Sequence, residues 1–332
     1  MKDAVLAAHE LRKSFKAPRR PPVEAVRGVS MEVRGGEIFG FLGPNGAGKT
    51  TTLRMLTTLL PIDSGVATVA GYDVQRSAQQ VRTRIGYVSQ LGGSDELATG
   101  RENLVLQGRL YGDDTSTVRR RVAELIELLE LEAFADRRVI TYSGGQRRRL
   151  DVALGIVHAP KVLFLDEPST GLDPQNRANL WSHIAALRDR GTTVFLTTHY
   201  LEEADELCDR LMIIDHGVIV AEGAPRELKR QIAGDTVLLS VREQDHTAQR
   251  AEQRLRTQPY VRELSAEGTT LRLYVEEGAS AMIEILRLLD GDGIGIQSLT
   301  VAEPTLDDVF LRQTGRSLRD AGQRPETEKR RA

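Results

Sequence analysis

The chain has 332 residues, a length that suits one large domain plus a smaller one better than a single small domain. Its 45 Lys and Arg nearly balance its 47 Asp and Glu, and this balance, together with an aromatic content of only 5%, argues against a protein that coats nucleic acid or stacks its bases. One cysteine, Cys208, excludes a disulfide framework, and no apolar run reaches the length of about 18 residues that a membrane-spanning helix needs.

Short apolar runs alternate with helical stretches over about the first 230 residues, a pattern typical of an α/β domain. A helix is predicted from Lys49 to Leu60, because Pro61 ends the run of helix-forming residues. Residues 17–22 are rich in proline and are expected to form a loop between two N-terminal strands. The predicted strands occupy residues 29–33, 38–42, 162–165, 193–196 and 210–215.

A different pattern begins near residue 235. Strands are predicted at residues 236–242, 261–264, 270–275 and 294–301, with helices at residues 248–257 and 281–289. The order β-α-β-β-α-β matches the split ferredoxin-like arrangement. We therefore predict one domain at residues 4–234, an accessory α+β domain at 235–313, and a charged, disordered tail at 314–332.

A phosphate loop is predicted after the strand at residues 38–42, where the chain matches G-x-x-x-x-G-K-[ST]. Its glycines let backbone N–H groups converge on phosphate oxygens, and the following helix N-terminus favours an anion. Lys49 is expected to reach the β- and γ-phosphates, and the Thr50 hydroxyl to coordinate Mg²⁺. The predicted nucleotide-binding residues are Gly43, Pro44, Asn45, Gly46, Ala47, Gly48, Lys49, Thr50 and Thr51.

Two carboxylates, Asp166 and Glu167, end the apolar strand at residues 162–165. Ligand sites of parallel sheets lie at the carboxyl ends of the strands, so both carboxylates are expected near the phosphate loop. Asp166 suits the Mg²⁺ shell, directly or through water. Glu167 suits the polarisation of a water molecule against the γ-phosphate. A solvated strand end with two charges is the simpler alternative.

A second helix N-terminus suited to phosphate is predicted at Ser143, Gly144, Gly145 and Gln146, where Ser143 is a good N-cap residue. For an isolated Ser-Gly-Gly turn, an ordinary N-cap is the simpler interpretation. The arginines at residues 147–149 are expected to lie on a solvated helix face.

These motifs together resemble the ATP-binding subunit of an ATP-binding cassette (ABC) transporter, over residues 4–230. In family order they are Walker A at residues 43–50, a Q-loop glutamine at Gln90, the signature at 143–146, Walker B at 162–167, a D-loop aspartate at Asp173 and a switch histidine at His199. The resemblance implies a P-loop NTPase domain with a helical signature subdomain, followed by the small α+β domain.

The resemblance also implies a mechanism. Two copies would pair head to tail, so that each ATP lies between Walker A of one copy and Ser143 and Gly145 of the other. Glu167 would act as the general base, His199 would hold the γ-phosphate and the attacking water, and Gln90 would link Mg²⁺ to the transport machinery. Asp173 would communicate between the two sites. Phe15 lies where the family stacks an aromatic ring on adenine; a strand core residue is the alternative.

Tyr142 stands where the family usually has leucine before the signature serine. The run at residues 142–151 and the ending at residues 303–311 resemble the daunorubicin-resistance subgroup of drug and antibiotic exporters. The resemblance thus implies an active ATPase that drives export of drug-like, antibiotic or lipid compounds through a separate integral-membrane permease. Such a subunit would sit at the cytoplasmic face of the cell membrane through that permease, with ATP and Mg²⁺ as cofactors and no nucleic acid as partner.

Three other functions fit the sequence less well. A soluble ABC ATPase with a translation-related role usually carries two cassettes in one chain, and this chain has one. DNA-repair and chromosome-organising ATPases insert long coiled coils between Walker A and Walker B, and the segment from Lys49 to Asp166 is too short for them. A regulator that binds nucleotide without hydrolysis would not need Glu167 and His199. The transported compound would contact the permease rather than this chain.

Overall fold

The computed structural model describes residues 4–16, 21–231, 235–242, 247–302 and 304–318. The chain divides into two compact units, Met1–Pro225 with Gln313–Ala332, and Arg226–Arg312. The domain boundaries predicted above, 4–234, 235–313 and 314–332, remain a prediction. Residues 232–234 and 319–332, which include most of the predicted tail, lie outside the described part.

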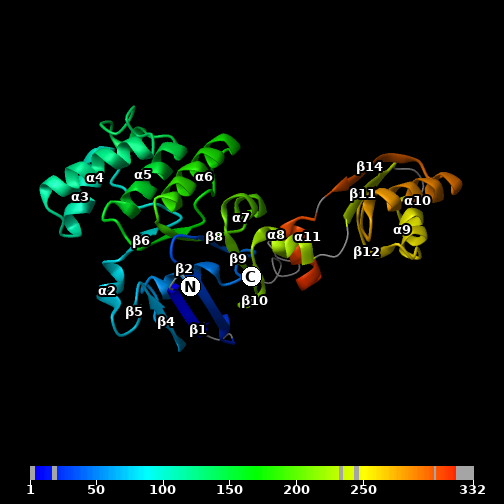
Figure 1. The fold of residues 1–332 in the computed structure, drawn as a ribbon, viewed down its shortest axis with the longest axis horizontal. Helices are drawn as coiled ribbons and strands as arrows, with labels where there is room; N and C mark the ends of the chain where they lie inside the picture. Colours follow the sequence, from blue (N-terminus) through cyan, green and yellow to red (C-terminus); the bar gives the residue numbers. More distant parts are fainter. Residues whose placement is uncertain (1–3, 17–20, 232–234, 243–246, 303, 319–332) are drawn as a thin grey trace. The chain divides into compact units, whose positions relative to one another are not determined.

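The larger unit contains two sheets (Figure 1). The antiparallel sheet has the order β2-β1-β4-β5, with β1 Ala4–Phe15, β2 Val23–Arg34, β4 Ser64–Val69 and β5 Tyr72–Asp73. The six-stranded sheet has the order β10-β9-β3-β8-β7-β6 and is parallel except for the hairpin β9–β10. Its strands are β3 Ile38–Leu42, β6 Ile85–Val88, β7 Val162–Asp166, β8 Thr193–Thr198, β9 Arg210–Asp215 and β10 Val218–Gly223.

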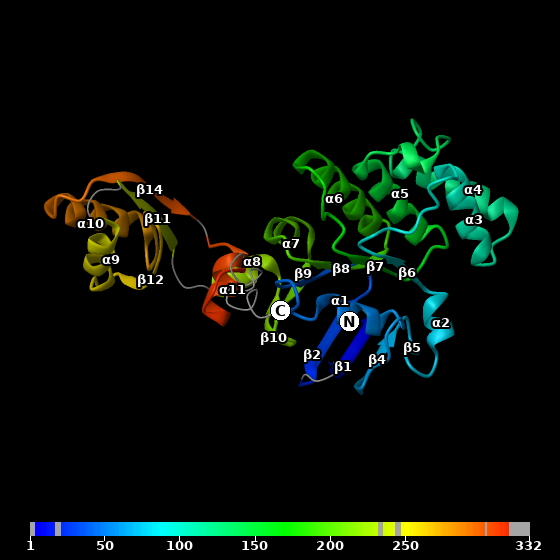
Figure 2. The same cartoon turned by 180° about the vertical axis from the view of Figure 1, so that it is seen from behind.

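Helices cover the six-stranded sheet on one side, and the antiparallel sheet lies on the other (Figures 1 and 2). The helical segment comprises α3 Gly100–Leu110, α4 Thr115–Leu128, the short 3-10 turn η1 Val139–Thr141, and α5 Gly144–Ile156. The remaining helices of this unit are α1 Lys49–Leu56, α2 Ala78–Arg82, α6 Pro174–Asp189 and α7 Leu201–Leu207.

The predicted central strands are confirmed. Their sequences are continuous apolar runs. Every residue of β3, β7 and β8 is buried, as expected for parallel strands covered on both faces. Phe195 lies between Phe39, Phe41 and Phe164, with ring centroids 5.5 to 5.8 Å apart. These rings form the centre of the core beneath the phosphate loop.

Two sequence predictions need correction. The helix predicted to reach Leu60 ends at Leu56, because Thr58 takes a left-handed conformation with φ of 64°. The strand predicted at residues 29–33 covers only the C-terminal part of the longer β2. Of the loop predicted at residues 17–22, residues 17–20 lie outside the described part.

The smaller unit contains the predicted β-α-β-β-α-β order, which is confirmed. Its four strands form an antiparallel sheet of order β12-β13-β11-β14, and its core holds Leu239, Leu255, Leu273 and Ile285. Its elements are α8 Pro225–Gln231, β11 Asp235–Val241, α9 Thr247–Arg256, β12 Val261–Glu267, β13 Thr270–Val275, α10 Gly278–Gly291, β14 Ile296–Ala302 and α11 Leu306–Thr314. Among all described helices of the chain, none combines the length and the apolar character needed to span a bilayer.

Candidate functional site

The phosphate loop connects the end of β3 to the start of α1, as predicted. Gly46 and Gly48 have φ of 83° and 108°, a region that side chains other than glycine rarely adopt. A Cβ atom on Gly48 would lie 2.4 Å from the carbonyl oxygen of Ala25. The loop conformation therefore requires glycine at this position and leaves the N-terminus of α1 open to an anion.

The ammonium group of Lys49 lies inside the loop. Its Nζ donates hydrogen bonds to the carbonyl oxygens of Gly43, at 2.7 Å, and Pro44, at 3.1 Å, and lies 3.3 Å from Oε1 of Glu167. Burial lowers the pKa of Lys49, while the neighbouring carboxylates of Glu167 and Asp166 act in the opposite direction. The side chain is thus buried at the position where phosphates would enter.

Asp166 is buried at the end of β7 and joins two hydroxyl groups. Its Oδ1 accepts hydrogen bonds from Thr50 Oγ1, at 3.0 Å, and from Thr197 Oγ1, at 2.7 Å. Hydroxyl and carboxylate oxygens fit Mg²⁺, which usually keeps several water or phosphate ligands. No cluster of three or more His, Cys, Asp or Glu side chains in the described residues could hold a metal by itself. Thr50 and Asp166 therefore fit a Mg²⁺ ion that is shared with a phosphate.

The carboxylate of Glu167 lies close to polar side chains from several parts of the site. Its Oε2 lies 3.2 Å from His199 Nδ1 without the geometry of a hydrogen bond, and it accepts long hydrogen bonds from Gln90 Nε2, at 3.5 Å, and Thr170 Oγ1, at 3.3 Å. Burial alone would raise the pKa of Glu167. His199 and Lys49 outweigh burial and lower this pKa to about 2. The carboxylate is therefore ionised at neutral pH.

One cavity of about 530 Å³ joins these groups. The predicted residues that line it come from the phosphate loop, the end of β7, the loop after β6 and the end of β8: Asn45, Gly46, Gly48, Lys49, Thr50, Thr51, Gln90, Glu167 and His199. Ala25 and Thr170 also line it, and the sequence analysis did not identify them. Ala25 lies in β2, which carries no motif, so the sequence holds no signal for its position.

The signature residues lie outside this cavity. Ser143 is the N-cap of α5 and forms a capping box with Gln146, and neither these two nor Gly144 and Gly145 line the cavity. Ser143 and Gly144 are exposed. The structure of one chain therefore leaves the signature free to meet another surface.

Asp173 lies next to the signature. It is the N-cap of α6 and accepts a hydrogen bond from the backbone N–H of Asn176, which lowers its pKa. A Cβ atom on Gly145 would lie 2.3 Å from Oδ1 of the same Asn176, so the N-termini of α5 and α6 are in contact. The two predicted interface motifs thus share one surface.

Phe15 ends β1 and is 42% exposed, so it is not a core residue. It does not line the cavity of about 530 Å³. A neighbouring hollow of about 760 Å³ is lined by Ser14, Lys16 and Val23, and shares Ala25 and Gly46 with the main cavity. The adenine contact of Phe15 stays a prediction.

The expected solvated face at residues 147–149 is wrong for Arg148 and, in part, for Arg149, whose side chain is 17% exposed and lies over the Phe134 ring. Arg147 pairs with Glu96 at the surface, but Arg148 is 7% exposed and donates to three main-chain carbonyl groups. A run of three arginines gave no sign that the middle one points inward.

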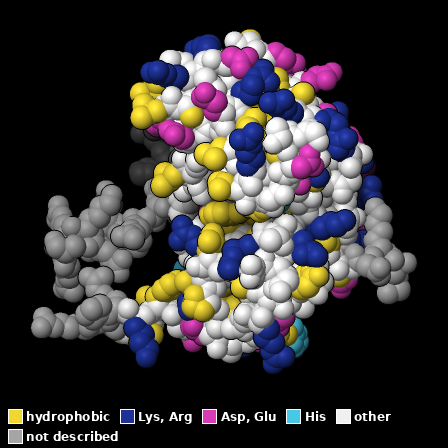
Figure 3. Space-filling view, turned by 90° about the vertical axis from the view of Figure 1, so that its left-hand side faces the viewer, with side chains coloured by type: hydrophobic (Ala, Val, Ile, Leu, Met, Phe, Trp, Pro, Cys, Tyr) yellow, Lys and Arg dark blue, Asp and Glu magenta, His cyan; other side chains and the backbone are white. Residues whose placement is uncertain are grey.

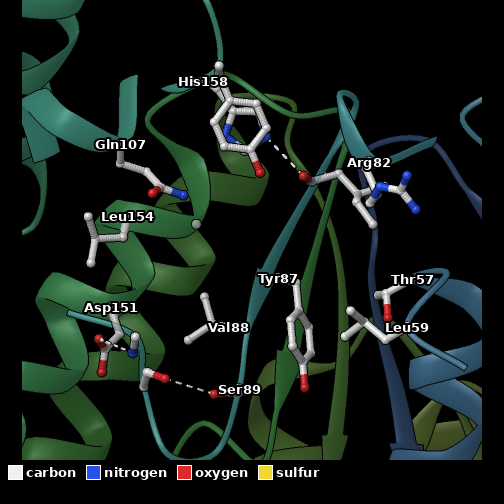
Figure 4. Close-up of a pocket in the computed structure, with 15 residues that line it drawn as sticks. Thr57, Leu59, Arg82, Tyr87, Val88, Ser89, Gln107, Asp151, Leu154 and His158 are labelled. Carbon is white, nitrogen blue, oxygen red and sulfur yellow. Dashed lines mark hydrogen bonds between the residues drawn. The ribbon is translucent and has the colours of Figure 1, made fainter. Parts of the chain in front are cut away.

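A second cavity, of about 420 Å³, lies next to the loop that carries Gln90, since Ser89 and Gly92 line it. Figure 4 shows side chains of β6, α3 and α5 facing this cavity, with Leu59 on the opposite side. Five exposed apolar side chains belong to the segments that line this cavity, and we call them the apolar patch: Leu59, Leu91, Leu106, Leu110 and Tyr111. Leu59 and Tyr111 line the cavity themselves, Leu91 lies between Ser89 and Gly92, and Leu106 and Leu110 lie on α3. Figure 3 shows hydrophobic side chains forming a band on one face of the molecule, with Lys and Arg side chains on both sides.

Comparison with known families and proteins gives consistent results. A family model described as ABC transporter matches residues 26–170, and one described as the C-terminal domain of DrrA1-3-like ATP-binding proteins matches residues 223–314. The chain is 44% identical to the daunorubicin resistance ATP-binding protein DrrA2 of Streptomyces coeruleorubidus, over 88% of this chain and 90% of that protein. It is 39% identical to the Nod factor export ATP-binding protein I of Paraburkholderia xenovorans, over 96% of this chain and all of that protein.

Among solved structures, the chain resembles cbiO1 of Clostridium perfringens, which is described as part of an ABC transporter complex. The TM-score is 0.61 at 25% sequence identity, over 69% of this chain and 94% of that one. The predicted fold class, a cassette followed by an α+β domain, is confirmed by this likeness and by the two family models.

Proposed function

Because the chain belongs to the ATP-binding proteins of ABC transporters, in the group named for daunorubicin resistance, we propose that it hydrolyses ATP to drive export through a separate membrane permease. The observation that carries this proposal is the position of Glu167. Its carboxylate lies within 3.5 Å of polar atoms of Lys49, Gln90 and His199, at a cavity that the phosphate loop lines.

We propose that Lys49 exchanges its bonds to Gly43 and Pro44 for the β- and γ-phosphates when ATP enters. Glu167 then loses its ammonium partner and faces a polyanion, so its pKa rises from about 2 toward that of a useful base. The ionised carboxylate accepts the proton of the attacking water, and His199, 3.2 Å away, holds the transferred phosphoryl group and that water. Mg²⁺, held by Thr50 and Asp166 with Gln90 near, would supply positive charge to the phosphate oxygens.

The site of one chain is incomplete, and we propose that a second copy completes it head to tail. The exposed Ser143 and Gly144 stand at the N-terminus of α5, where free N–H groups favour an anion. Since none of the signature residues lines the cavity of its own chain, the partner's cavity is the surface they fit. Asp173, at the adjoining N-terminus of α6, would then lie at the interface.

We propose that the permease binds at the apolar patch, since exposed apolar side chains beside a cavity commonly mark a protein interface. The patch adjoins Gln90, so a permease seated there can influence the residue that touches Glu167. Peripheral attachment to the cytoplasmic face of the cell membrane follows from this docking.

The cargo is proposed by class only, as drug-like, antibiotic or lipid compounds. Relatives at 44% and 39% identity carry names that refer to daunorubicin and to Nod factor, so closely similar cassettes serve different cargos. The cassette supplies the energy, and the permease selects the compound.

The replacement Glu167→Gln tests the chemistry of this proposal. We expect ATP turnover to fall at least about 100-fold, because an amide cannot accept the proton from water. Binding of a fluorescent ATP analogue should persist, because Lys49 and Thr50 are unchanged. Glu202→Gln, an exposed carboxylate paired with Arg177, is the matched control and should keep full turnover. Undiminished turnover in Glu167→Gln would remove the general-base assignment.

The replacement Leu91→Asp tests the docking surface. Leu91 is 94% exposed, so a carboxylate there should not disturb the fold, yet it should lower co-purification with the permease about 10-fold or more by charging a desolvated interface. ATP turnover of the isolated chain should stay unchanged. Val66→Asp, an exposed position on β4, is the control. Equal co-purification of both variants with the permease would exclude the patch as the docking surface.

A further inference from the structure

Within the described residues, the hydrogen bonds that Arg148 donates all go to main-chain carbonyl oxygens next to the candidate site. Its Nε donates to Pro168 O at 2.7 Å, its Nη1 to Ser89 O at 2.7 Å, and its Nη2 to Asp166 O at 3.2 Å. A planar guanidinium can hold three acceptors in fixed directions, which a lysine ammonium cannot do in the same way. These bonds therefore fix three peptide groups relative to one another.

The burial of Arg148 is unfavourable for its own charge. Desolvation lowers the pKa of Arg148 even though the carboxylates of Asp151, Glu203 and Asp166 act in the opposite direction. A buried charge is tolerated when its hydrogen bonds are fully used, but a packed apolar side chain of the same size serves stability equally well. Stability alone thus gives no reason for an arginine at this position.

Two of the three carbonyl groups belong to the residues on either side of Glu167. Glu167 has φ of 47°, a left-handed conformation that is unfavourable for a residue with a side chain. Such a conformation persists only where the surroundings fix it, and here Arg148 holds the carbonyl of Asp166 before it and of Pro168 after it. This backbone conformation aims the carboxylate at Lys49 and His199.

The third carbonyl group belongs to Ser89, the residue before Gln90. The Gln90 amide in turn reaches Glu167 Oε2 at 3.5 Å. Arg148 therefore connects the main chains of both side chains that meet at the reacting end of the cavity. Arg148 itself belongs to α5, whose N-cap is Ser143, so it ties the helix that presents the signature to Glu167 of the same chain.

We propose that Arg148 is a positioning residue for hydrolysis: it holds Glu167 and Gln90 in their reactive geometry and transmits the position of α5 to them. This inference rests on the proposed function. It extends that function because, in a head-to-tail dimer, the signature at the start of α5 contacts the partner's ATP. A shift of α5 on that contact would then move Arg148, and with it the Glu167 of the same chain, which acts on the ATP bound to that chain.

The test compares Arg148→Met, which keeps the volume and removes all donors, Arg148→Lys, which keeps the charge, and Arg147→Lys, a surface control paired with Glu96. In the purified full-length chain we measure kcat and KM for ATP, the dissociation constant of a fluorescent ATP analogue, and the melting temperature. We expect kcat to fall about 10- to 100-fold in Arg148→Met and less in Arg148→Lys, because a small displacement of a reacting group is enough for such a loss. KM and analogue binding should change by less than about two-fold.

Each other result overturns the proposal. If the Arg148→Met variant is folded and has the kcat of the parent, then Glu167 does not need the hydrogen bonds of Arg148 to keep its reactive position. Equal losses in kcat and in analogue binding indicate general damage to the site. If both variants at Arg148 are unfolded at the assay temperature, the arginine serves folding instead. A parental chain without turnover would refute the proposed function first, and this inference with it.

Discussion

Glu167 and Glu203 are glutamates whose surroundings shift their pKa values in opposite directions. Burial alone would raise the pKa of Glu167, but its neighbours His199 and Lys49 lower it to about 2. Glu203 is fully buried on α7, where Ser169 and Trp181 donate neutral hydrogen bonds to it, and desolvation raises its pKa. The cation-paired carboxylate is available as a base, whereas the other keeps its proton to higher pH.

The raised pKa of Glu203 predicts how stability depends on pH. Because the folded pKa exceeds the unfolded one, the unfolded chain loses its proton first as pH rises, and the folded state loses stability over that interval. Glu203→Gln cannot ionise and keeps an acceptor for Trp181. Its melting temperature relative to the parent should therefore increase by about 2 °C or more between about pH 5 and pH 8.

The exposed neighbour Glu202 provides the control for this measurement, since its side chain is 78% exposed. Glu202→Gln should shift the melting temperature by the same amount at both pH values. If Glu203→Gln and the parent have parallel curves of melting temperature against pH, then Glu203 is ionised throughout and its assignment as a proton-retaining group is wrong.

At the scale of single residues, the sequence predicts which side chains come together in the site, but not which contacts fix their positions. Glu167 was assigned from its place after an apolar strand, and the structure places it beside Lys49 as expected. Its left-handed backbone and the support from Arg148 carry no sequence signal, because both depend on carbonyl groups that any residue type provides. Thr197 could have been inferred, since it is the next-to-last residue of β8 and pairs with Asp166 in the parallel register.

Elements with strong local signals were predicted well. The all-buried strands β3, β7 and β8 follow from apolar runs, and the start of α5 follows from the N-cap residue Ser143. The antiparallel sheet was predicted least well. Its long strands β1 and β2 contain bulges that shift the register, and bulges interrupt the alternation on which strand prediction depends.

The start of α5 has two roles that substitutions can separate. Ser143→Asp keeps a good N-cap residue, so the melting temperature should stay within about 2 °C of the parent. The added carboxylate would face the phosphates of the partner's ATP, and turnover should fall at least about 10-fold through charge repulsion.

Ser143→Asn is the matched control, because asparagine caps a helix equally well and carries no charge. The loss of turnover should be clearly smaller than for Ser143→Asp, with both rates measured at saturating ATP. Equal losses in the two variants would mean that the signature does not approach a phosphate.

At the scale of the whole molecule, the chain contains two units with separate hydrophobic cores. All residues that line the nucleotide cavity belong to the larger unit. Composition and length predicted a large and a small domain. They carry no information on the proposed completion of the site by a second copy, which rests on the resemblance of the motifs and on the position of the signature outside the cavity.

The most direct test of the central claim, a site completed by a second copy, is a mixing experiment. Lys49→Met disables the phosphate loop, and Ser143→Asp disables the signature, so each variant alone has two defective sites per dimer and should be inactive. A mixed dimer holds one site with both defects and one fully intact site. Equal mixing should therefore restore up to about a quarter of parental turnover, as a two-fold symmetric head-to-tail dimer requires. If the mixture stays as inactive as the separate variants, each site is contained in one chain and the account is wrong.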